Sequence, residues 1–162
     1  MKELPKNQLN PKVKNVWRIT DAILLTASFV LPFILFLAVY LVESLSWSLI
    51  VTIAIAALYV VSMIFWLVIL PPIRFIRWRY ELSHDFLDIA KGIVWRKRYI
   101  IPFVRVQNTD TRQGPILRAF GLSSVTVSTA AGEHEIPGLD NEVAEQLRDK
   151  AAELARIAQE DI

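Results

Sequence analysis

The chain has 162 residues, of which 54% are hydrophobic and 21% charged, and its mean hydropathy of +0.39 is high for a water-soluble domain. Residues 1–79 hold eight Lys/Arg and three Asp/Glu, whereas residues 80–162 hold ten Lys/Arg and thirteen Asp/Glu. The pI near 9.0 therefore comes from the first half and does not indicate nucleic-acid binding, and the lack of cysteine excludes disulfides and thiol chemistry.

Residues 1–21 predict a basic cytoplasmic lead-in whose end lies at the membrane interface. Pro5 and Pro11 discourage an early helix, and Trp17 suits the headgroup level. The bases of this segment are Lys2, Lys6, Lys12, Lys14 and Arg18.

Two uncharged apolar runs follow, residues 22–42 and 49–70, separated only by residues 43–48. A helix rises about 1.5 Å per residue, so each run is long enough to cross a hydrocarbon core about 30 Å thick. Neither run has a polar residue at every third or fourth place, as a buried soluble helix would, and the first is too long for a cleaved signal peptide. The sequence therefore predicts a transmembrane hairpin over residues 22–72, with a kink at Pro32 and an end at Pro71-Pro72.

The distribution of bases predicts the orientation of this hairpin. The connecting loop has one acidic residue and no Lys or Arg, whereas Arg74, Arg77 and Arg79 follow the second run. Because cytoplasmic loops carry the excess of Lys and Arg, we expect a multi-pass plasma-membrane protein with both termini cytoplasmic and Trp47 at the outer interface.

Residues 73–162 predict a small cytoplasmic α+β domain. Alternating patterns predict strands over 80–83, 86–89, 93–101, 104–109, 123–129 and 134–136, and Gly114-Pro115 to Gly121 predicts one short helix between strands. Asp140 suits the cap of a last helix with an apolar stripe of Val143, Leu147, Ala151, Leu154 and Ile157/Ala158. This single amphipathic helix needs a partner surface, for which a curved antiparallel sheet is the obvious choice.

Several short motifs in this domain occur together in one family. They are Arg79-Tyr80-Glu81-Leu82, Lys91-Gly92, Ile101-Pro102, Arg105-Val106-Gln107, Asn108-Thr109-Asp110, Gln113-Gly114-Pro115, Leu117-Arg118, Phe120-Gly121-Leu122 and the turn 129–132. With the preceding hairpin, this string resembles the membrane-flanked bacterial PH-like domain family, the YdbS-like proteins. The resemblance implies a PH-like bent antiparallel sheet or partial barrel closed by one C-terminal helix. It also implies a hetero-complex with a larger membrane protein that carries several such domains.

No set of residues in the chain has the pattern of an active site. The glycines stand singly at turns, Ser123-Ser124 lack the strand–turn–helix setting of a hydrolase nucleophile, and the paired carboxylates flank hairpins. A metal site joining His84 and His134 is an alternative, although exposed turn histidines are commoner. We therefore expect no catalysis, no metal and no cofactor.

The best binding candidates are cations that lie close to the inner leaflet. On a strand, Arg96 and Arg98 share one face, and Lys97 shares the other face with Trp95 and Tyr99. With Arg74, Arg77 and Arg79, they are candidates for binding anionic lipid or a partner. For the strand cations, the alternative is a solvated face, or a sheet edge whose charges prevent aggregation. For the three arginines after the second run, it is a stop-transfer anchor whose long side chains reach to the membrane interface.

The family-like motif residues are expected to be mostly structural. In that interpretation Gln107 satisfies backbone groups in a bend, and Arg118 pairs with Asp110. The full set is Arg105, Gln107, Asp110, Gly114, Pro115, Arg118 and Gly121.

These observations predict a small integral membrane protein that presents its PH-like domain as a non-catalytic interaction or scaffold module. The first hypothesis is a complex with another membrane protein, for which the small residues Ala54, Ala56 and Ala57 in the second span are a hint. The alternative is a module that binds anionic lipid at the inner leaflet.

Overall fold

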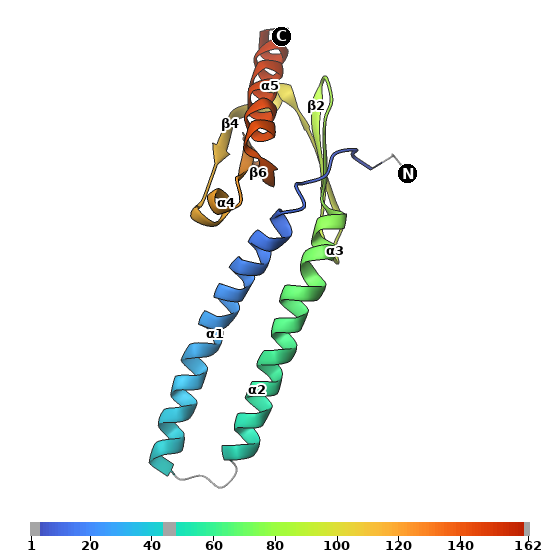
Figure 1. Ribbon diagram of the computed structural model, residues 1–162. Coiled ribbons are helices and arrows are strands. Elements are labelled where there is room, and N and C mark those ends of the chain that lie inside the picture. The colour runs from blue at the N-terminus through green and yellow to red at the C-terminus, as the bar shows by residue number, and fades with distance from the viewer. Residues whose placement is uncertain (1–3, 44–47, 161–162) are drawn as a thin grey trace. The chain divides into compact units, whose positions relative to one another are not determined.

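The computed structural model describes residues 4–43 and 48–160, which form two compact units (Figure 1). One unit is helical and contains residues 17–72, and the other contains residues 4–16 together with 73–160. The expectation for Trp47 lies outside the described residues. In this division the start of the chain, residues 4–16, groups with the C-terminal domain.

The helical unit holds two long apolar helices. Helix α1 runs over Val13–Glu43, and α2 (Ser48–Ile64) continues through a π-helical turn, η1 (Phe65–Ile69), into α3 (Leu70–Arg77). The stretches Val13–Ala38 and Ile50–Arg77 are long and apolar enough to cross a membrane, and their most apolar windows are not buried inside protein. Core helices of a soluble protein would be buried, so the exposed apolar surface supports a membrane environment.

The helix of the second apolar run does not end at Pro71-Pro72 but continues to Arg77. Proline has no N–H, so Pro71 leaves the carbonyl of Leu67 without its helical donor. The Arg18 Nε donates to that carbonyl at 3.0 Å. A neighbouring helix thus satisfies the carbonyl that the proline leaves free, which is how membrane helices tolerate proline.

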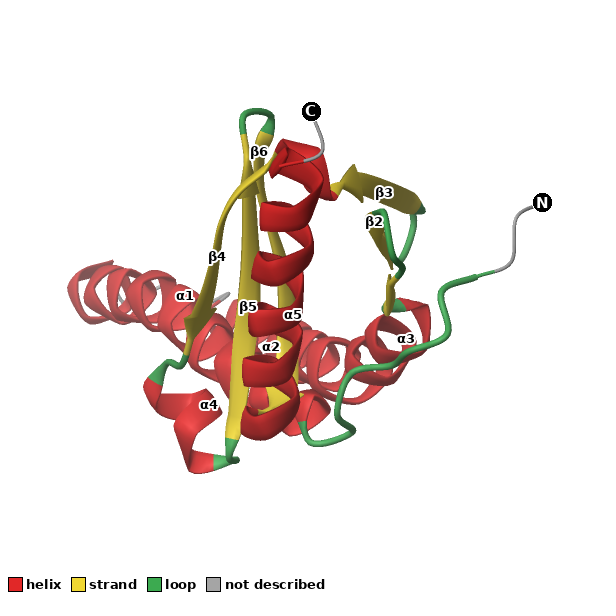
Figure 2. Ribbon diagram, turned by 90° about the horizontal axis from the view of Figure 1, so that it is seen from above, coloured by secondary structure: helices red, strands yellow, loops and turns green. Residues whose placement is uncertain are grey.

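The second unit contains two three-stranded antiparallel sheets in the orders β1-β2-β3 and β4-β5-β6. Helix α5 lies along the second sheet (Figure 2). The prediction of an α+β domain of antiparallel strands with one C-terminal helix is confirmed. The elements are β1 (Arg79–Leu82), β2 (Phe86–Lys91), β3 (Lys97–Pro102), the 3-10 turn η2 (Phe103–Arg105), β4 (Val106–Arg112), α4 (Pro115–Ala119), β5 (Leu122–Thr129), β6 (Gly132–Asp140) and α5 (Asn141–Glu160).

The core of this unit lies between the sheets and α5. Its fully buried apolar side chains include Leu87, Ile89, Phe103, Leu122, Val125, Val127, Ile136 and Leu139. The buried face of α5 consists of Ala144, Leu147, Ala151 and Ala155. The predicted stripe was wrong for Val143 and Ile157, which are exposed, because small alanines occupy the face against the sheet.

Residues 4–12, here called the N-terminal strap, form part of the second unit. The backbone N–H of Asn7 donates to the carbonyl of Tyr80, and the N–H of Tyr80 donates back, each at 3.0 Å. Leu9 is buried, and the Asn10 amide donates to both carboxylate oxygens of Asp140 at 2.7–2.8 Å. The expectation that Asp140 caps the last helix is therefore wrong: its carboxylate holds the strap.

Strand β6 is longer than predicted and continues through Pro137-Gly138. The pairing register shifts opposite Ser123–Val125, which places the proline in a bulge. Gly138 has φ +65°, and a Cβ there would overlap the Val13 side chain, lying 2.5 Å from the Val13 Cβ. The glycine thus permits the close approach between β6 and the beginning of α1.

Candidate functional site

Five of the six candidate binding cations, all except Arg74, line one cavity of about 310 Å³ on the second unit. The cavity lies between the end of α3, β1 and the β2–β3 hairpin, and no Asp or Glu is among its described lining residues. We call it the basic pocket, and its cations are Arg77, Arg79, Lys91, Arg96, Lys97 and Arg98. Strand pairing thus brings together cations that lie up to 21 positions apart in the sequence.

Arg98 is occupied by an ion pair with a buried carboxylate. Its guanidinium donates to both oxygens of Asp88, at 2.6 Å from Nη2 and 3.0–3.1 Å from Nε. Asp88 is only 3% exposed, and its hydrogen bonds raise the pKa of Arg98 above its usual value. Since an unpaired buried carboxylate is costly, the first role of Arg98 is structural.

Arg79 and Lys91 are also held by the protein. The Arg79 guanidinium lies against the amide oxygen of Gln8, once that amide is oriented to accept, and donates to the Trp78 carbonyl at 3.4 Å. The Lys91 ammonium lies over the rings of Trp78 and Tyr99, at 5.8 and 5.4 Å from their centroids. These contacts orient two walls of the basic pocket.

Arg77, Arg96 and Lys97 are different, because none of them has an ion pair with another described residue. Arg96 and Lys97 are exposed, and Arg77 is half-exposed. With no carboxylate in the lining, their charges are not compensated locally. The basic pocket is therefore suited to an anionic group such as a phosphate.

The prediction of a strand over residues 93–101 is wrong in its first part, since residues 93–96 form the turn before β3. Gly92 has φ +118°, and a Cβ there would collide with the Trp95 carbonyl group, so the tight turn requires glycine. Val94 and Trp95 at its tip are 82% and 81% exposed. The strand faces expected for Trp95 and Arg96 do not form, and an apolar tip stands beside the cations instead.

The two histidines lie apart in different environments. His84 is exposed, and its Nδ1 lies 3.3 Å from Asp85. The His134 ring packs against Tyr99, with 4.8 Å between ring centroids, and burial and the nearby Lys91 lower its pKa below the usual value. Within residues 4–43 and 48–160, no three His, Asp or Glu side chains gather in an arrangement that could hold a metal.

The structure partly matches the roles expected for the motif residues around the short helix. Gly114 precedes α4, Pro115 begins it, and Gly121 after it has φ +67°, as predicted. Gln107 is exposed and has no side-chain hydrogen bond to a described residue, so it does not satisfy the bend. The Gln159 amide fills that role and donates to the carbonyl of Val106 at 3.0 Å.

The expected pair of Arg118 and Asp110 does not form. The Asp110 carboxylate accepts from the Asn108 amide at 2.9 Å, and Arg118 has no ion pair within the described part of the chain. Sequence reasoning also missed a polar link between strand and helix: the Asn141 side-chain oxygen accepts from Ser123 at 2.8 Å and from Gln113 at 3.0 Å. Only the position of Gln113 in the motif string hinted at this link.

A second cavity, the edge groove, lies between β3, the start of β4 and the β5–β6 turn. Its volume is about 850 Å³, and its lining includes the exposed side chains of Ile100, Val104, Arg105 and Gln107. In the described sheet β3 has a neighbouring strand on one side only. The outward edge of β3 therefore offers unpaired backbone groups beside this groove.

Comparison with known proteins gives a match over both units. The family model described as "Bacterial PH domain" matches residues 22–155, which include the two long helices as well as the sheets. The UPF0699 transmembrane protein YdbS of Bacillus subtilis (strain 168) is 38% identical over 162 residues, which cover 100% of both chains. No solved structure matches the chain significantly.

Proposed function

Because the chain belongs to the bacterial PH domain family, we propose that it is a membrane-anchored, non-catalytic module whose basic pocket binds the headgroups of anionic lipids. The observation that carries this proposal is the grouping of Arg77, Arg96 and Lys97, without local counter-charges, in one cavity. The exposed Val94-Trp95 tip supports it, since an apolar and aromatic tip suits the membrane interface.

The position of the basic pocket in the chain supports a ligand at the inner leaflet. Leu70 is the last residue of the second uncharged run, and Arg77 follows it by seven helical residues, a path of about 10 Å. Arg77 therefore lies within about 10 Å of the end of that apolar run. The proposed orientation is multi-pass in the plasma membrane, with both termini cytoplasmic. It follows from the excess of Lys and Arg on one side of the hairpin.

A labelling experiment tests this orientation. The chain has no cysteine, so single cysteines at Ser46 in the loop and at Ala131 in the exposed β5–β6 turn should react from opposite sides of the membrane. Reaction of both positions from the same side would refute the orientation, and with it a ligand in the inner leaflet.

Lipid binding is tested by titrating the detergent-solubilised full chain with a short-chain phosphatidylglycerol below its micelle concentration, following the total tryptophan fluorescence, to which Trp95 is one of five contributors. A cation near the membrane surface contributes about 1 kcal/mol, so changing both Arg96 and Lys97 to Ala should weaken binding roughly 30-fold. The matched control is the variant with Arg118 and Lys150 changed to Ala, because both are exposed, lie outside the basic pocket and carry the same charge.

The control should bind like the unchanged chain, and phosphatidylcholine should not compete. Equal weakening in both double variants would mean that only net charge matters, and the site would be wrong. Arg98→Ala should instead lower the unfolding temperature, because this change leaves the buried Asp88 carboxylate without its partner. Arg96→Ala should leave the unfolding temperature unchanged.

The second candidate function is assembly with a larger membrane protein that carries several PH-like domains. The edge groove favours it, because an extended segment of a partner can add to the free edge of a strand such as β3. The exposed Ile100 and Val104 would contact such a segment.

Extraction from native membranes in mild detergent tests the complex. A second protein should co-purify stoichiometrically, and Val104→Asp should abolish this. Val143→Asp is the matched control, since Val143 on α5 is 41% exposed, against 40% for Val104, and lies outside the edge groove. Recovery of a lone chain, or equal effects of both changes, would contradict assembly through this edge.

A further inference from the structure

The β2–β3 hairpin places two lysines of the basic pocket directly opposite one another. Lys91, the last residue of β2, is the pairing partner of Lys97, the first residue of β3. Residues that face each other in an antiparallel pair lie on the same side of the sheet, with Cβ atoms about 5 Å apart. Like charges at that spacing repel each other, so the hairpin closes on an unfavourable contact.

The surroundings of the two lysines do not neutralise either charge. The Lys91 ammonium lies over the rings of Trp78 and Tyr99, which attract a cation but carry no net charge. Lys97 is exposed, and neither lysine has an ion pair with a described residue. An anion bound beside both ammonium groups would remove the repulsion between them.

Three arginines add to the positive charge of the basic pocket. Arg77, Arg79 and Arg96 line the same cavity, and they too have no ion pair within the described part of the chain. Together with the two lysines they make five cations without a counter-charge among the described residues. A ligand with a single negative charge would leave most of this charge uncompensated.

The carboxylates nearest in the sheet are already engaged. Glu81 and Asp88 are cross-strand partners, and both act electrostatically on Arg98. Asp88 is paired with Arg98, and the Glu81 carboxylate lies 3.9 Å from the Lys6 ammonium. Neither carboxylate lines the basic pocket, so the compensating charge has to come from a ligand.

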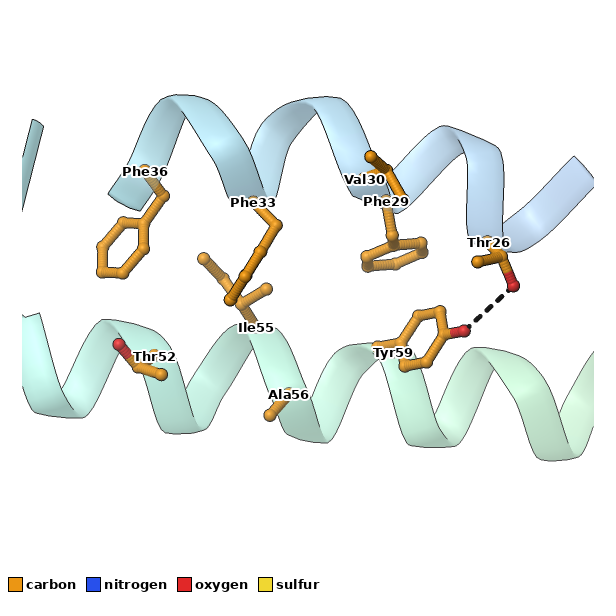
Figure 3. Close-up of a pocket in the computed structure, with 9 residues that line it drawn as sticks. All are labelled: Thr26, Phe29, Val30, Phe33, Phe36, Thr52, Ile55, Ala56 and Tyr59. Carbon is orange, nitrogen blue, oxygen red and sulfur yellow. Dashed lines mark hydrogen bonds between the residues drawn. The ribbon is translucent and has the colours of Figure 1, made fainter. Parts of the chain in front are cut away.

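The cavity between α1 and α2 offers no comparable charge. No charged side chain is among its described lining residues, and the hydroxyls of Thr26 and Tyr59 form a hydrogen bond with each other at 3.2 Å (Figure 3). A charged ligand would lose its hydration there without meeting a counter-charge. A multiply charged ligand therefore belongs to the basic pocket.

We propose that the basic pocket selects a phosphate monoester, which carries two negative charges, over a phosphate diester, which carries one. This inference rests on the proposed function and narrows it to one class of headgroup. A diester compensates one of the two facing lysines, whereas a monoester above its second pKa of about 6 compensates both. Phosphatidic acid carries such a group in a lipid, and glycerol 3-phosphate carries it in solution.

Two titrations of the detergent-solubilised full chain compare the two ligand classes. One uses short-chain phosphatidic acid and the other phosphatidylglycerol of the same chain length, both below their micelle concentrations. At pH 7.5 phosphatidic acid should bind roughly fivefold more tightly, which is the effect of one further charge facing a cation. At pH 5 its second charge is mostly lost, so the ratio of affinities should fall below about twofold.

The protein contributes little to this change in the ratio. The charged residues of the described pocket lining are all Lys or Arg, which stay protonated from pH 5 to 7.5. His134, which interacts electrostatically with Lys91, gains a proton at low pH. That added charge strengthens the binding of both lipids, so the ratio of affinities reports the second charge of the ligand.

A matched pair of variants tests the facing lysines. Lys97→Met should reduce the ratio at pH 7.5 to below about twofold, because the second ligand charge loses its partner. Lys150→Met should leave the ratio unchanged, since Lys150 is exposed and lies outside the basic pocket. Without ligand, Lys97→Met should not lower the unfolding temperature, because the change removes a repulsion; a clear decrease would show that Lys97 is structural and would overturn the inference.

The remaining outcomes separate this inference from the proposed function. Equal affinities of the two lipids at both pH values, with both weakened by the double change of Arg96 and Lys97 to Ala, would overturn the inference and leave the proposed function intact. Binding of neither lipid would overturn both. If glycerol 3-phosphate binds as tightly as phosphatidic acid, the monoester class is supported and the lipid source is refuted.

Discussion

Gly138→Ala should loosen the N-terminal strap without unfolding the domain. The new methyl group would overlap the Val13 side chain, 2.5 Å from its Cβ, whereas carbon atoms prefer about 3.5–4.0 Å. Such overpacking costs about 1–3 kcal/mol. The φ of +65° adds about 1–2 kcal/mol for a residue with a Cβ.

The two contributions appear in different measurements. Opening the strap together with the first turn of α1, which holds Val13, relieves the overlap but not the backbone strain, so only the overpacking accelerates this local opening. Amide hydrogen exchange of Asn7 and Asn10, whose N–H groups bond to Tyr80 and Gly138, should therefore speed up about 5- to 150-fold. The backbone strain should appear only as a lower unfolding temperature of the whole domain.

Gly114→Ala is the matched control. That glycine has φ −74°, and a Cβ there would meet nothing within 4 Å, so exchange in the strap should not change. If Gly138→Ala and Gly114→Ala gave the same exchange rates for Asn10, the strap would not be packed against β6, and its assignment to this unit would be wrong.

Two further predictions concern the helix pair and the response to pH. Arg18→Met should destabilise the pair by about 0.6–2 kcal/mol in a denaturant titration, because the Leu67 carbonyl loses its donor, and the loss should shrink in a Pro71→Ala background that restores the helical N–H. Additive effects of the two changes would refute this link. Since burial and Lys91 lower the pKa of His134 below its usual 6.5, the folded domain binds fewer protons than the unfolded chain. Stability should therefore fall as the pH drops below about 6.5 and remain constant above it. His134→Phe should flatten that slope in thermal unfolding from pH 5 to 7.5, and an unchanged slope would place its origin elsewhere.

Local features were predictable where local physics decides them. Two runs longer than 20 residues without a charge require a non-aqueous environment wherever they pack. The short helix α4 was predictable for a similar reason, since Pro115 and Gly121 each have backbone preferences that act without distant partners. The turn at Gly92 was also predictable from a local backbone preference, although the prediction did not include residues 93–96 in it.

Long-range pairing decided the rest, and a sequence pattern does not report it. Arg98 pairs with Asp88, whereas Arg96 has no ion pair with a described residue. This difference depends on the register of β2 and β3, which places Asp88 beside Ile100 and Ala90 beside Arg98. The gathering of Arg77 with the hairpin cations follows from the pairing of β1 with β2, which places Arg79, two residues after Arg77, beside Ala90.

The sequence by itself thus determined three features. Its composition shows that the chain is apolar enough for a membrane and that its start is basic, and its hydrophobic pattern shows that strands precede a last helix. Tertiary structure decided that the N-terminal strap belongs to the second unit, that Arg18 replaces the donor lost at Pro71, and which cations remain available to a ligand. The physical reason is that hydropathy and backbone preferences act within a few residues. A hydrogen-bond or ion-pair partner, in contrast, is chosen by residues far along the chain that folding brings within about 3 Å.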